Sequence, residues 1–544
     1  MRKSRWWALA GILALSIVAV ACGSSDSKDE SKATVAPGGG TQAAAGTASS
    51  SQAAANVKRG GTLVAVMTAN PKTFDPMLAN DVESGRLTPS VFDSLYKYDE
   101  DLKPVPWLAE KVDINQDSTE YTFFMRKGIK FHDGTEMDAE AVKFSMDRIR
   151  NNKASVRYAD VKTVTDISVL DKYTVKVTLS EPNSPFPSKL TGGAGYVVSP
   201  TAVKAMGDEK FGLSPVGTGP FKFGDFKNDV SASVVKWEGY WKQGADGKAL
   251  PYLDKVEWRV ITEAATRLTA LQSGDVDVSI LREADVPIAK KDSGLVVKEG
   301  PGFGWGGLWL TINKPPFDSK ALRQAVQFGI DRDEINKTIY EGTRVLANGP
   351  IPPGITWAVD KNYTPYPTKA DPDKAKQKLA EGGKPGGFEF EFMISSGDQT
   401  TQQLAELIQA QLAKVGIKMS IKAADFNGVV IPALMKGESN SYSLGLTGGV
   451  DPDQHLAGAF QTGGGFNFSP YSNAQVDELL KKGRAVNNLE ERAKIYKDAN
   501  KLVMEDSPYI FTVYAVDRVS VRKNVQGWYL GSRATAGYSE YWKQ

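Results

Sequence analysis

The segment between Phe388 and Lys422 constrains the fold more than any other part of the sequence. It begins with FEFEFMI, which is typical of a strand, and continues with TQQLAELIQAQLAKV, in which the large apolar residues recur on one helical stripe. Gly416 follows as a helix-terminating residue, and IKMSIK then alternates as a second strand. Two strands joined by one helix and short links form a crossover unit, which requires a parallel sheet. We therefore predict an α/β fold.

Other segments indicate the same class. Gly61–Thr68 is apolar and rich in β-branched residues, and Tyr173–Leu179 alternates with a period of two, as half-buried strands do. Asp138 stands where it can cap a helix whose apolar residues share one face. Further helices are predicted at 473–486 and 489–505. Because strands and helices alternate along the chain, an all-β protein and a helical bundle are excluded.

The N-terminal segment indicates export and a tether. A short basic stretch at 2–5 precedes an apolar run at 6–21, which is the layout of a secretory signal peptide. The run ends in AVAC, which resembles the lipobox of bacterial lipoproteins, in which the cysteine carries the lipid. Cys22 is the single cysteine of 544 residues, so we expect a signal peptide at 1–22 and lipidation at Cys22. Residues 23–57 are mostly small and polar and bury too little surface to fold, which predicts a disordered tether.

The body of the chain, residues 58–544, is longer than a single hydrophobic core usually serves, and we expect two or more lobes. Its charge excludes one class of function. With 66 basic and 64 acidic residues the formal net charge is +2, so there is no basic field of the kind that holds nucleic acid. No second apolar run is long enough to span a bilayer. We therefore expect no nucleic-acid partner and no second membrane segment.

Motifs of nucleotide-binding and catalytic sites are not met. Residues 302–307, GFGWGG, match G-x-G-x-x-G by letter, but LWLTIN follows as a strand, whereas a dinucleotide site needs a helix N-terminus. No G-x-x-x-x-G-K-[ST], G-x-S-x-G or H-E-x-x-H occurs. Asp451 and Asp453 resemble a glycosidase pair only in spacing, since charged pairs beside turns more often cap helices or face solvent. We expect no enzymatic activity and no cofactor.

Six blocks of sequence recur in the order of one known family. The blocks are TFDP at 73–76, LAEKVDINQDSTEYTFFMRKGIKFHDG at 108–134, PVGTGPF at 215–221, LTALQSGDVDV at 268–278, NKPPFDSKALRQAVQFGIDRDEI at 313–335 and PIPPG at 350–354. Together they resemble the family 5 extracellular solute-binding proteins, which bind dipeptides, oligopeptides, nickel chelates and some glycans. Because the six blocks span nearly the whole body in the family's order, their joint match is highly specific.

The resemblance implies a two-lobe periplasmic-binding-protein fold of the type II kind, with a hinge and a ligand cleft between the lobes. Lobe I would take 58–308 plus 515–544, and lobe II would take 309–514. The chain would then be the substrate-binding component of an ABC importer, which captures peptides by lobe closure and delivers them to the permease. We expect a monomer at the outer face of the bacterial cytoplasmic membrane, anchored through Cys22.

The resemblance also assigns three segments to the cleft wall: the loop after TFDP, the strand that enters lobe II, and a glycine-rich strand late in that lobe. Exposed backbone N–H and C=O groups on such a strand can pair with an extended peptide as another strand would. The residues that correspond to these segments are Asn80, Asp81, Val82, Trp309, Thr311, Gly445, Leu446, Thr447, Gly448 and Gly449.

The glycine-rich strand departs from the family pattern at two positions. The family's peptide binders have a Trp and then an Asp whose carboxylate pairs with the peptide's ammonium, whereas this chain has Leu446 and Gly449. Either Asp451 supplies the counter-charge from a shifted loop, or the ligand has no free ammonium there. A buried ammonium without a partner is costly, so this position separates substrate classes. The alternatives to a peptide binder are a binder of an oligosaccharide or metal chelate, a surface sensor and a membrane-tethered hydrolase.

The chain has two histidines, and neither is expected to bind a metal directly. His132 belongs to the FHDG turn of the family block and is expected to be structural. His455 follows the Asp451 loop, from which it could reach the cleft. It lacks a nearby His or Cys that would complete a transition-metal site.

Overall fold

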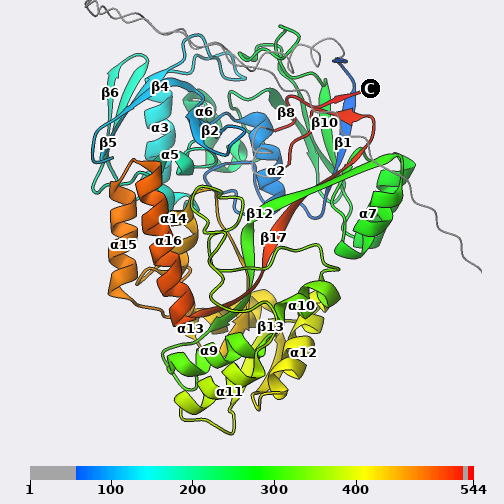
Figure 1. The fold of residues 1–544 in the computed structure, drawn as a ribbon. Coiled ribbons are helices and arrows are strands. Elements are labelled where there is room, and N and C mark those ends of the chain that lie inside the picture. The colour runs from blue at the N-terminus through cyan, green and yellow to red at the C-terminus, as the bar shows by residue number, and fades with distance from the viewer. Residues whose placement is uncertain (1–56, 531–536) are drawn as a thin grey trace, which may run out of the picture. The chain divides into compact units, whose positions relative to one another are not determined.

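A computed structural model describes residues 57–530 and 537–544 (Figure 1). The predicted signal peptide, the lipidation site at Cys22 and nearly all of the predicted tether lie outside the described residues. Within the described ranges, no helix combines the length and the apolar character that crossing a bilayer requires. The body contains strands and helices in alternation, which confirms the predicted α/β class.

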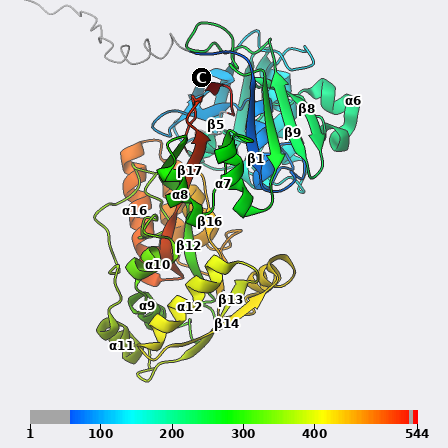
Figure 2. The same ribbon diagram turned by 90° about the vertical axis from the view of Figure 1, so that its right-hand side faces the viewer.

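A mixed sheet of 11 strands runs through the described chain (Figures 1 and 2). Its order is β14 (Lys418–Ala424), β13 (Glu389–Ser395), β15 (Ser441–Ser443), β12 (Leu295–Leu310), β17 (Tyr509–Arg522), β11 (Val278–Ser279), β1 (Thr62–Met67), β10 (Lys255–Val260), β9 (Ser231–Lys236) and β8 (Phe221–Lys227), and β16 (Leu446–Thr447) pairs with β12. The two longest strands, β12 and β17, are antiparallel neighbours, and their register shifts between Pro301 and Trp305. They connect the two ends of the sheet.

Smaller sheets complete the β structure. An antiparallel sheet has the order β4 (Ala109–Ile114), β5 (Glu120–Met125), β7 (Thr174–Leu179) and β6 (Val164–Asp171), and two-stranded pairs are formed by β2 (Tyr96–Tyr98) with β3 (Pro104–Pro106) and by β18 (Val525–Gln526) with β19 (Trp542–Lys543). The last pair lies near the C-terminus of the chain, marked in Figure 1.

Helices pack against these sheets. Those before β12 are α2 (Val82–Val91), α3 (Ala139–Arg150), α4 (Tyr158–Val161), α5 (Phe186–Lys189), α6 (Pro200–Phe211), α7 (Ala264–Ser273) and α8 (Val286–Lys291). Those after it are α9 (Lys320–Gly329), α10 (Arg332–Ile339), α11 (Pro372–Glu381), α12 (Gln399–Ala413), α13 (Ile431–Lys436), α14 (Pro452–Phe460), α15 (Ala474–Ala485) and α16 (Leu489–Asp506). Figure 1 shows α15 and α16 side by side, and both match the helices predicted there.

The predicted crossover unit is present as β13, α12 and β14. The two strands are parallel over their whole length, from Glu389 opposite Lys418 to Ser395 opposite Ala424. Gly416 has a φ of 87°, the left-handed conformation that a helix-terminating glycine adopts without a Cβ penalty. The crossover prediction is therefore confirmed.

Apolar side chains of the described residues gather in four larger cores. One core consists of buried side chains from within residues 77–197, and a second combines buried side chains from within 63–258 with others from 519–541. The other two draw different buried side chains from within 303–514 and 308–510. The C-terminal tail thus packs with the first half of the chain, while the predicted lobe boundaries at 308/309 and 514/515 stay a prediction.

Candidate functional site

A cavity of about 400 Å³ lies where β1, β11, β12 and β17 meet α2, the loop after β16 and the C-terminal tail. Its wall is formed by Ala65, Val66, Arg86, Val278, Ser279, Ile280, Phe303, Thr447, Gly448, Asp517, Arg518, Val519, Ser520, Tyr529, Tyr538 and Tyr541. We call this space the cleft cavity. Its volume lies within the range of small-molecule sites, and its wall combines apolar groups with a few polar ones, as such sites do.

The predicted glycine-rich strand reaches the cleft cavity through Thr447 and Gly448. Thr447 is opposite Gly304 in the antiparallel pair of β16 and β12, and the Gly448 N–H donates to the Phe303 carbonyl over 2.8 Å. A Cβ on Gly448 would lie 2.6 Å from the His455 ring, so only glycine fits without displacement. β12 therefore holds this strand at the cavity wall. Gly445, Leu446 and Gly449 belong to the same segment but do not line the cavity.

His455 supports that loop from behind. Its side chain is buried, and Nε2 lies 2.7 Å from the Gly449 carbonyl oxygen, a hydrogen bond that requires a proton on that nitrogen. Burial lowers the pKa of His455 to about 4, so the imidazole is neutral near pH 7. The sequence suggested that His455 could reach the cleft, but the structure places it behind the wall.

Asp451 has a partner inside the protein. Both of its carboxylate oxygens accept from Arg492 Nη2 at 3.0 Å, and the two side chains are 5% and 6% exposed. Asp451 also caps α14 by accepting from the Asp453 N–H at 3.0 Å. Asp453 is bound in turn by Arg484 at 2.9 Å. Both carboxylates near the missing family aspartate are thus buried, charge-compensated and absent from the cavity wall.

The loop after TFDP places its predicted residues outside the cavity. Asp81 caps α2, because its Oδ1 accepts from the Ser84 N–H at 2.9 Å. Asn80 is exposed, and 68% of the Val82 side chain faces solvent. One turn further along the helix, Arg86 reaches the cavity wall. The predicted roles of Asn80, Asp81 and Val82 as ligand contacts therefore stay a prediction, and α2 contributes Arg86 to the cavity wall.

Trp309 and Thr311 also lie away from the cavity. Trp309 is fully buried, and its ring centroid is 4.8 Å from that of Tyr509. The Thr311 hydroxyl donates to the Ser439 carbonyl over 2.7 Å. On the same strand as Trp309, Phe303 lines the cavity instead. Trp309 is enclosed in a hydrophobic core, and its predicted role as a ligand contact stays a prediction.

Among the described residues, three charged side chains line the cleft cavity, and two of them have counter-ions. Arg86 lies 3.1 Å from the Glu83 carboxylate, and Arg518 bonds the carboxylates of Glu283 and Glu299 at 2.8 and 2.7 Å. For Asp517, no hydrogen bond or ion pair to the carboxylate occurs within the described residues. Burial raises its pKa to about 6.

Sequence reasoning did not single out Asp517. The available signal was a carboxylate inside YIFTVYAVDRVSVR, an otherwise mostly apolar strand pattern. Charged residues in such a strand are rarely buried unless they are paired or functional.

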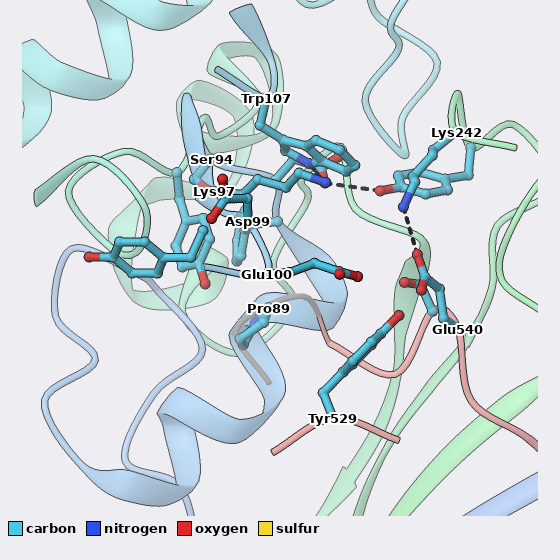
Figure 3. Close-up of a pocket in the computed structure, with 15 residues that line it drawn as sticks. Pro89, Ser94, Lys97, Asp99, Glu100, Trp107, Lys242, Tyr529 and Glu540 are labelled. Atoms are coloured by element: carbon cyan, nitrogen blue, oxygen red, sulfur yellow. Dashed lines mark hydrogen bonds and ion pairs between the residues drawn. The ribbon is translucent and has the colours of Figure 1, made fainter. Parts of the chain in front are cut away.

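A second cavity of about 320 Å³ adjoins Tyr529, which lines both spaces (Figure 3). In its wall, the Asp93 carboxylate accepts from Trp107 Nε1 at 2.8 Å and from the Tyr240 hydroxyl at 3.0 Å. Figure 3 shows Lys242 extended toward Glu540, with which it forms an ion pair of 2.6 Å. The polar groups of this space are thus engaged with one another, as in a structural network.

Metal ligands do not gather in the part of the chain that the structure describes. No group of three or more His, Cys, Asp or Glu side chains there is arranged to hold an ion. His132 Nδ1 accepts a hydrogen bond from the Gly217 N–H, and Nε2 is hydrogen-bonded to the Gly219 carbonyl oxygen. The ring packs edge-on against Trp237. These contacts agree with the predicted structural role.

Comparison with known proteins extends over most of the chain. The family model described as bacterial extracellular solute-binding proteins, family 5 middle, matches residues 103–468. The glutathione-binding protein GsiB of Salmonella paratyphi A is 32% identical over 479 residues, which cover 86% of this chain and 92% of that protein. The structure of DppA from Helicobacter pylori in complex with the peptide STSA superposes with a TM-score of 0.76 at 28% identity, covering 89% of this chain and 98% of the other. AgaA of A. tumefaciens R10, in complex with agropinic acid, gives a TM-score of 0.73 at 28% identity, covering 89% and 99%.

Proposed function

The chain belongs to the bacterial extracellular solute-binding proteins of family 5, and from this membership and the cleft cavity we propose that it captures peptides outside the cytoplasm and delivers them to an ABC permease. One observation carries the proposal: a single cavity is lined from both predicted lobes. Arg86 and Ser279 come from predicted lobe I, whereas Thr447 and Gly448 come from predicted lobe II. A ligand in this space would bridge the lobes.

The pairing of β12 with β17 supports lobe closure. These strands link the predicted lobes, and their register is broken between Pro301 and Trp305, next to Phe303 on the cavity wall. Such a break removes ladder hydrogen bonds and lets the strands bend locally. Rotation there would close the cavity around a ligand while each core stays packed, and the closed site would exclude water and strengthen polar contacts.

The remaining features of the proposal concern the anchor and the assembly. We infer that Cys22 carries a lipid, that the body acts as a monomer, and that it works at the outer face of the cytoplasmic membrane. The hydrolase alternative has no support in the similar proteins GsiB and DppA, which are binding proteins. The sensor alternative would use the same cavity, and growth of a deletion strain on the ligand as sole nitrogen source separates it from transport.

A non-peptide solute is the second candidate. Three tyrosines, Tyr529, Tyr538 and Tyr541, belong to the wall of the cleft cavity, and aromatic side chains are suited to contact with a ring or a sugar. The similarity to AgaA, whose structure holds agropinic acid, supports a non-peptide solute as the second candidate. An oligosaccharide or a metal chelate would use the same closure without pairing to an ammonium.

The test is a thermal-shift and calorimetric screen of the purified mature chain against di- to octapeptides, glutathione, oligosaccharides and nickel chelates. A ligand at about a hundred times its Kd adds about 2.7 kcal/mol of stability, enough for a shift of a degree or more. Peptide binding supports the main proposal, whereas response to sugars or chelates alone replaces it with the second candidate. Turnover of any ligand would instead indicate a hydrolase.

A matched pair of variants ties the signal to the cavity. Thr447→Trp adds a large ring at the cavity wall and should abolish binding, because Thr447 is an exposed wall residue. Leu170→Trp adds the same ring to β6, where the side chain is 57% exposed and remote from the wall residues, and should leave binding intact. Equal binding by both variants would place the ligand elsewhere.

A further inference from the structure

Asp517 stands out among the groups that line the cleft cavity. It is half-buried on β17, opposite Gly300 of β12, and its carboxylate has no hydrogen bond or ion pair within the described residues. The two other charged wall residues, Arg86 and Arg518, are each paired with carboxylates. The cavity wall therefore carries one uncompensated charge among its described residues, and that charge is negative.

Nearby acids cannot take the same role. Gly449, at the end of the glycine-rich strand, carries no charge that could pair with a ligand. The next carboxylates along the chain, Asp451 and Asp453, are 4% and 3% exposed and are held by Arg492 and Arg484. Freeing Asp451 would leave the buried Arg492 without its counter-charge, and freeing Asp453 would take the counter-charge from the half-buried Arg484, both of which are unfavourable. Asp517 needs no such rearrangement, because its carboxylate has no partner among the described residues and lies at the wall.

The surroundings of Asp517 suit a cation. Its backbone is held by pairing to β12, so the carboxylate is presented from a strand rather than from a loop. Three tyrosines share the wall with Asp517, and aromatic rings attract cations through their quadrupoles. Desolvation of a lone carboxylate is costly, and a ligand cation that enters the cavity offsets that cost by a charge-assisted hydrogen bond.

We propose that Asp517 is the anionic subsite of the cleft cavity and selects solutes that carry a protonated amine. This inference rests on the proposed function, which it deepens by naming the chemistry of the ligand. The amine belongs to the solute either as an α-ammonium or as a side-chain ammonium. In both cases its N–H groups donate to the Asp517 carboxylate, which replaces the counter-charge that the glycine-rich strand lacks.

Calorimetry of the full mature chain tests the subsite with matched peptides. One arm compares a lysine-free peptide that binds the wild type with its N-acetylated form, and the second compares an N-acetylated peptide with and without lysine. Asp517→Asn keeps the shape of the side chain and removes its charge. It should weaken the amine-bearing ligand about 10- to 100-fold, the range for a hydrogen bond to a charged group. The neutral analogue should bind wild type and variant alike.

The control is Asp225→Asn, which removes a carboxylate that is 64% exposed on β8 and absent from the cavity wall. It should bind all ligands as the wild type does. A drop confined to one arm assigns the α-ammonium or the side-chain amine, and either result supports the subsite. If Asp517→Asn binds the amine-bearing ligand as tightly as the wild type, the inference is overturned while the proposed function stands. If the wild type binds none of the panel, both are overturned.

Discussion

Replacing Asp517 by Asn should stabilise the ligand-free protein at neutral pH. Burial raises the pKa of this carboxyl from 3.8 to about 6, so the folded state holds its proton more tightly than the unfolded chain does. As pH rises from 3.8 to about 6, the unfolded chain loses the proton first, and the folded state becomes relatively less stable. Above about pH 6 the carboxylate is ionised in both states, and the folded state is destabilised by the full free energy that corresponds to the pKa shift. Asparagine has no charge to desolvate, so the variant avoids this cost.

The size of the destabilisation follows from the difference between the two pKa values. At about 1.4 kcal/mol per pKa unit, the shift from 3.8 to about 6 corresponds to about 3 kcal/mol. Because Asp517 faces a cavity and keeps some contact with solvent, we expect about half of this, roughly 1.5 kcal/mol. The stabilisation should be present at pH 7.5 and absent at pH 3.5. Arg86 and Arg518 face the same cavity, but their own counter-ions limit what they contribute.

Urea or thermal unfolding of wild type and Asp517→Asn at both pH values measures this difference. With a bound amine at pH 7.5, the wild type should become more stable than the variant. The amine stabilises the wild type by binding to Asp517, whereas it binds the variant only weakly and stabilises it little. A variant that is no more stable than the wild type at pH 7.5 would refute the reasoning, because the carboxylate would then have a partner that compensates its burial.

Three further predictions concern Gly448 on the cavity wall, the buried ion pair and the anchor. Gly448→Ala should weaken ligand binding in calorimetry and lower stability by about 1–3 kcal/mol, because the new Cβ would push the His455 ring, 2.6 Å away, from its place. Arg492→Met should lower the free energy of unfolding by about 3–5 kcal/mol in urea titration, because Asp451 would be left buried without a counter-charge. Cys22→Ala should leave the mature protein without a lipid, which intact-mass measurement of the membrane fraction detects.

Each of these has a control or a contradicting result. Gly465→Ala adds a Cβ with no atom within 4 Å and should leave binding and stability unchanged. Lys227→Met removes a cation that is 67% exposed beside Asp225 and should cost less than about 1 kcal/mol. Equal losses for Arg492→Met and Lys227→Met would contradict the burial argument. A lipid mass that survives the Cys22 substitution would place the anchor elsewhere.

Local patterns were enough to predict the elements of the fold. The crossover unit from β13 to β14 follows from alternation and helical periodicity within one segment, and the structure has the parallel pair. The capping role of Asp138 was also predicted, and its carboxylate accepts from the Ala141 N–H at 3.0 Å. The order of the six family blocks predicted the two-lobe fold, in agreement with the matched family and the superposed structures.

For the candidate site, the sequence alone predicted less than it did for the fold. The sequence identified Thr447 and Gly448 on the cavity wall, and it identified the two positions at which the family pattern is lost. It could not show that Asp451 is held by Arg492, which lies 41 residues further along the chain, or that Trp309 is enclosed in a core. Both depend on contacts between segments that are distant in sequence.

The sequence by itself therefore determined the class of the fold, the family and the glycine-rich strand, because periodicity, caps and block order are properties of neighbouring residues. Only the tertiary structure decided which carboxylate forms an internal ion pair and which lines the cavity. Asp451 and Asp517 are the same residue type, but Arg492 pairs with the Asp451 carboxylate, whereas no arginine pairs with Asp517 among the described residues. Charge compensation is set by distance in space, and the fold alone fixes that distance.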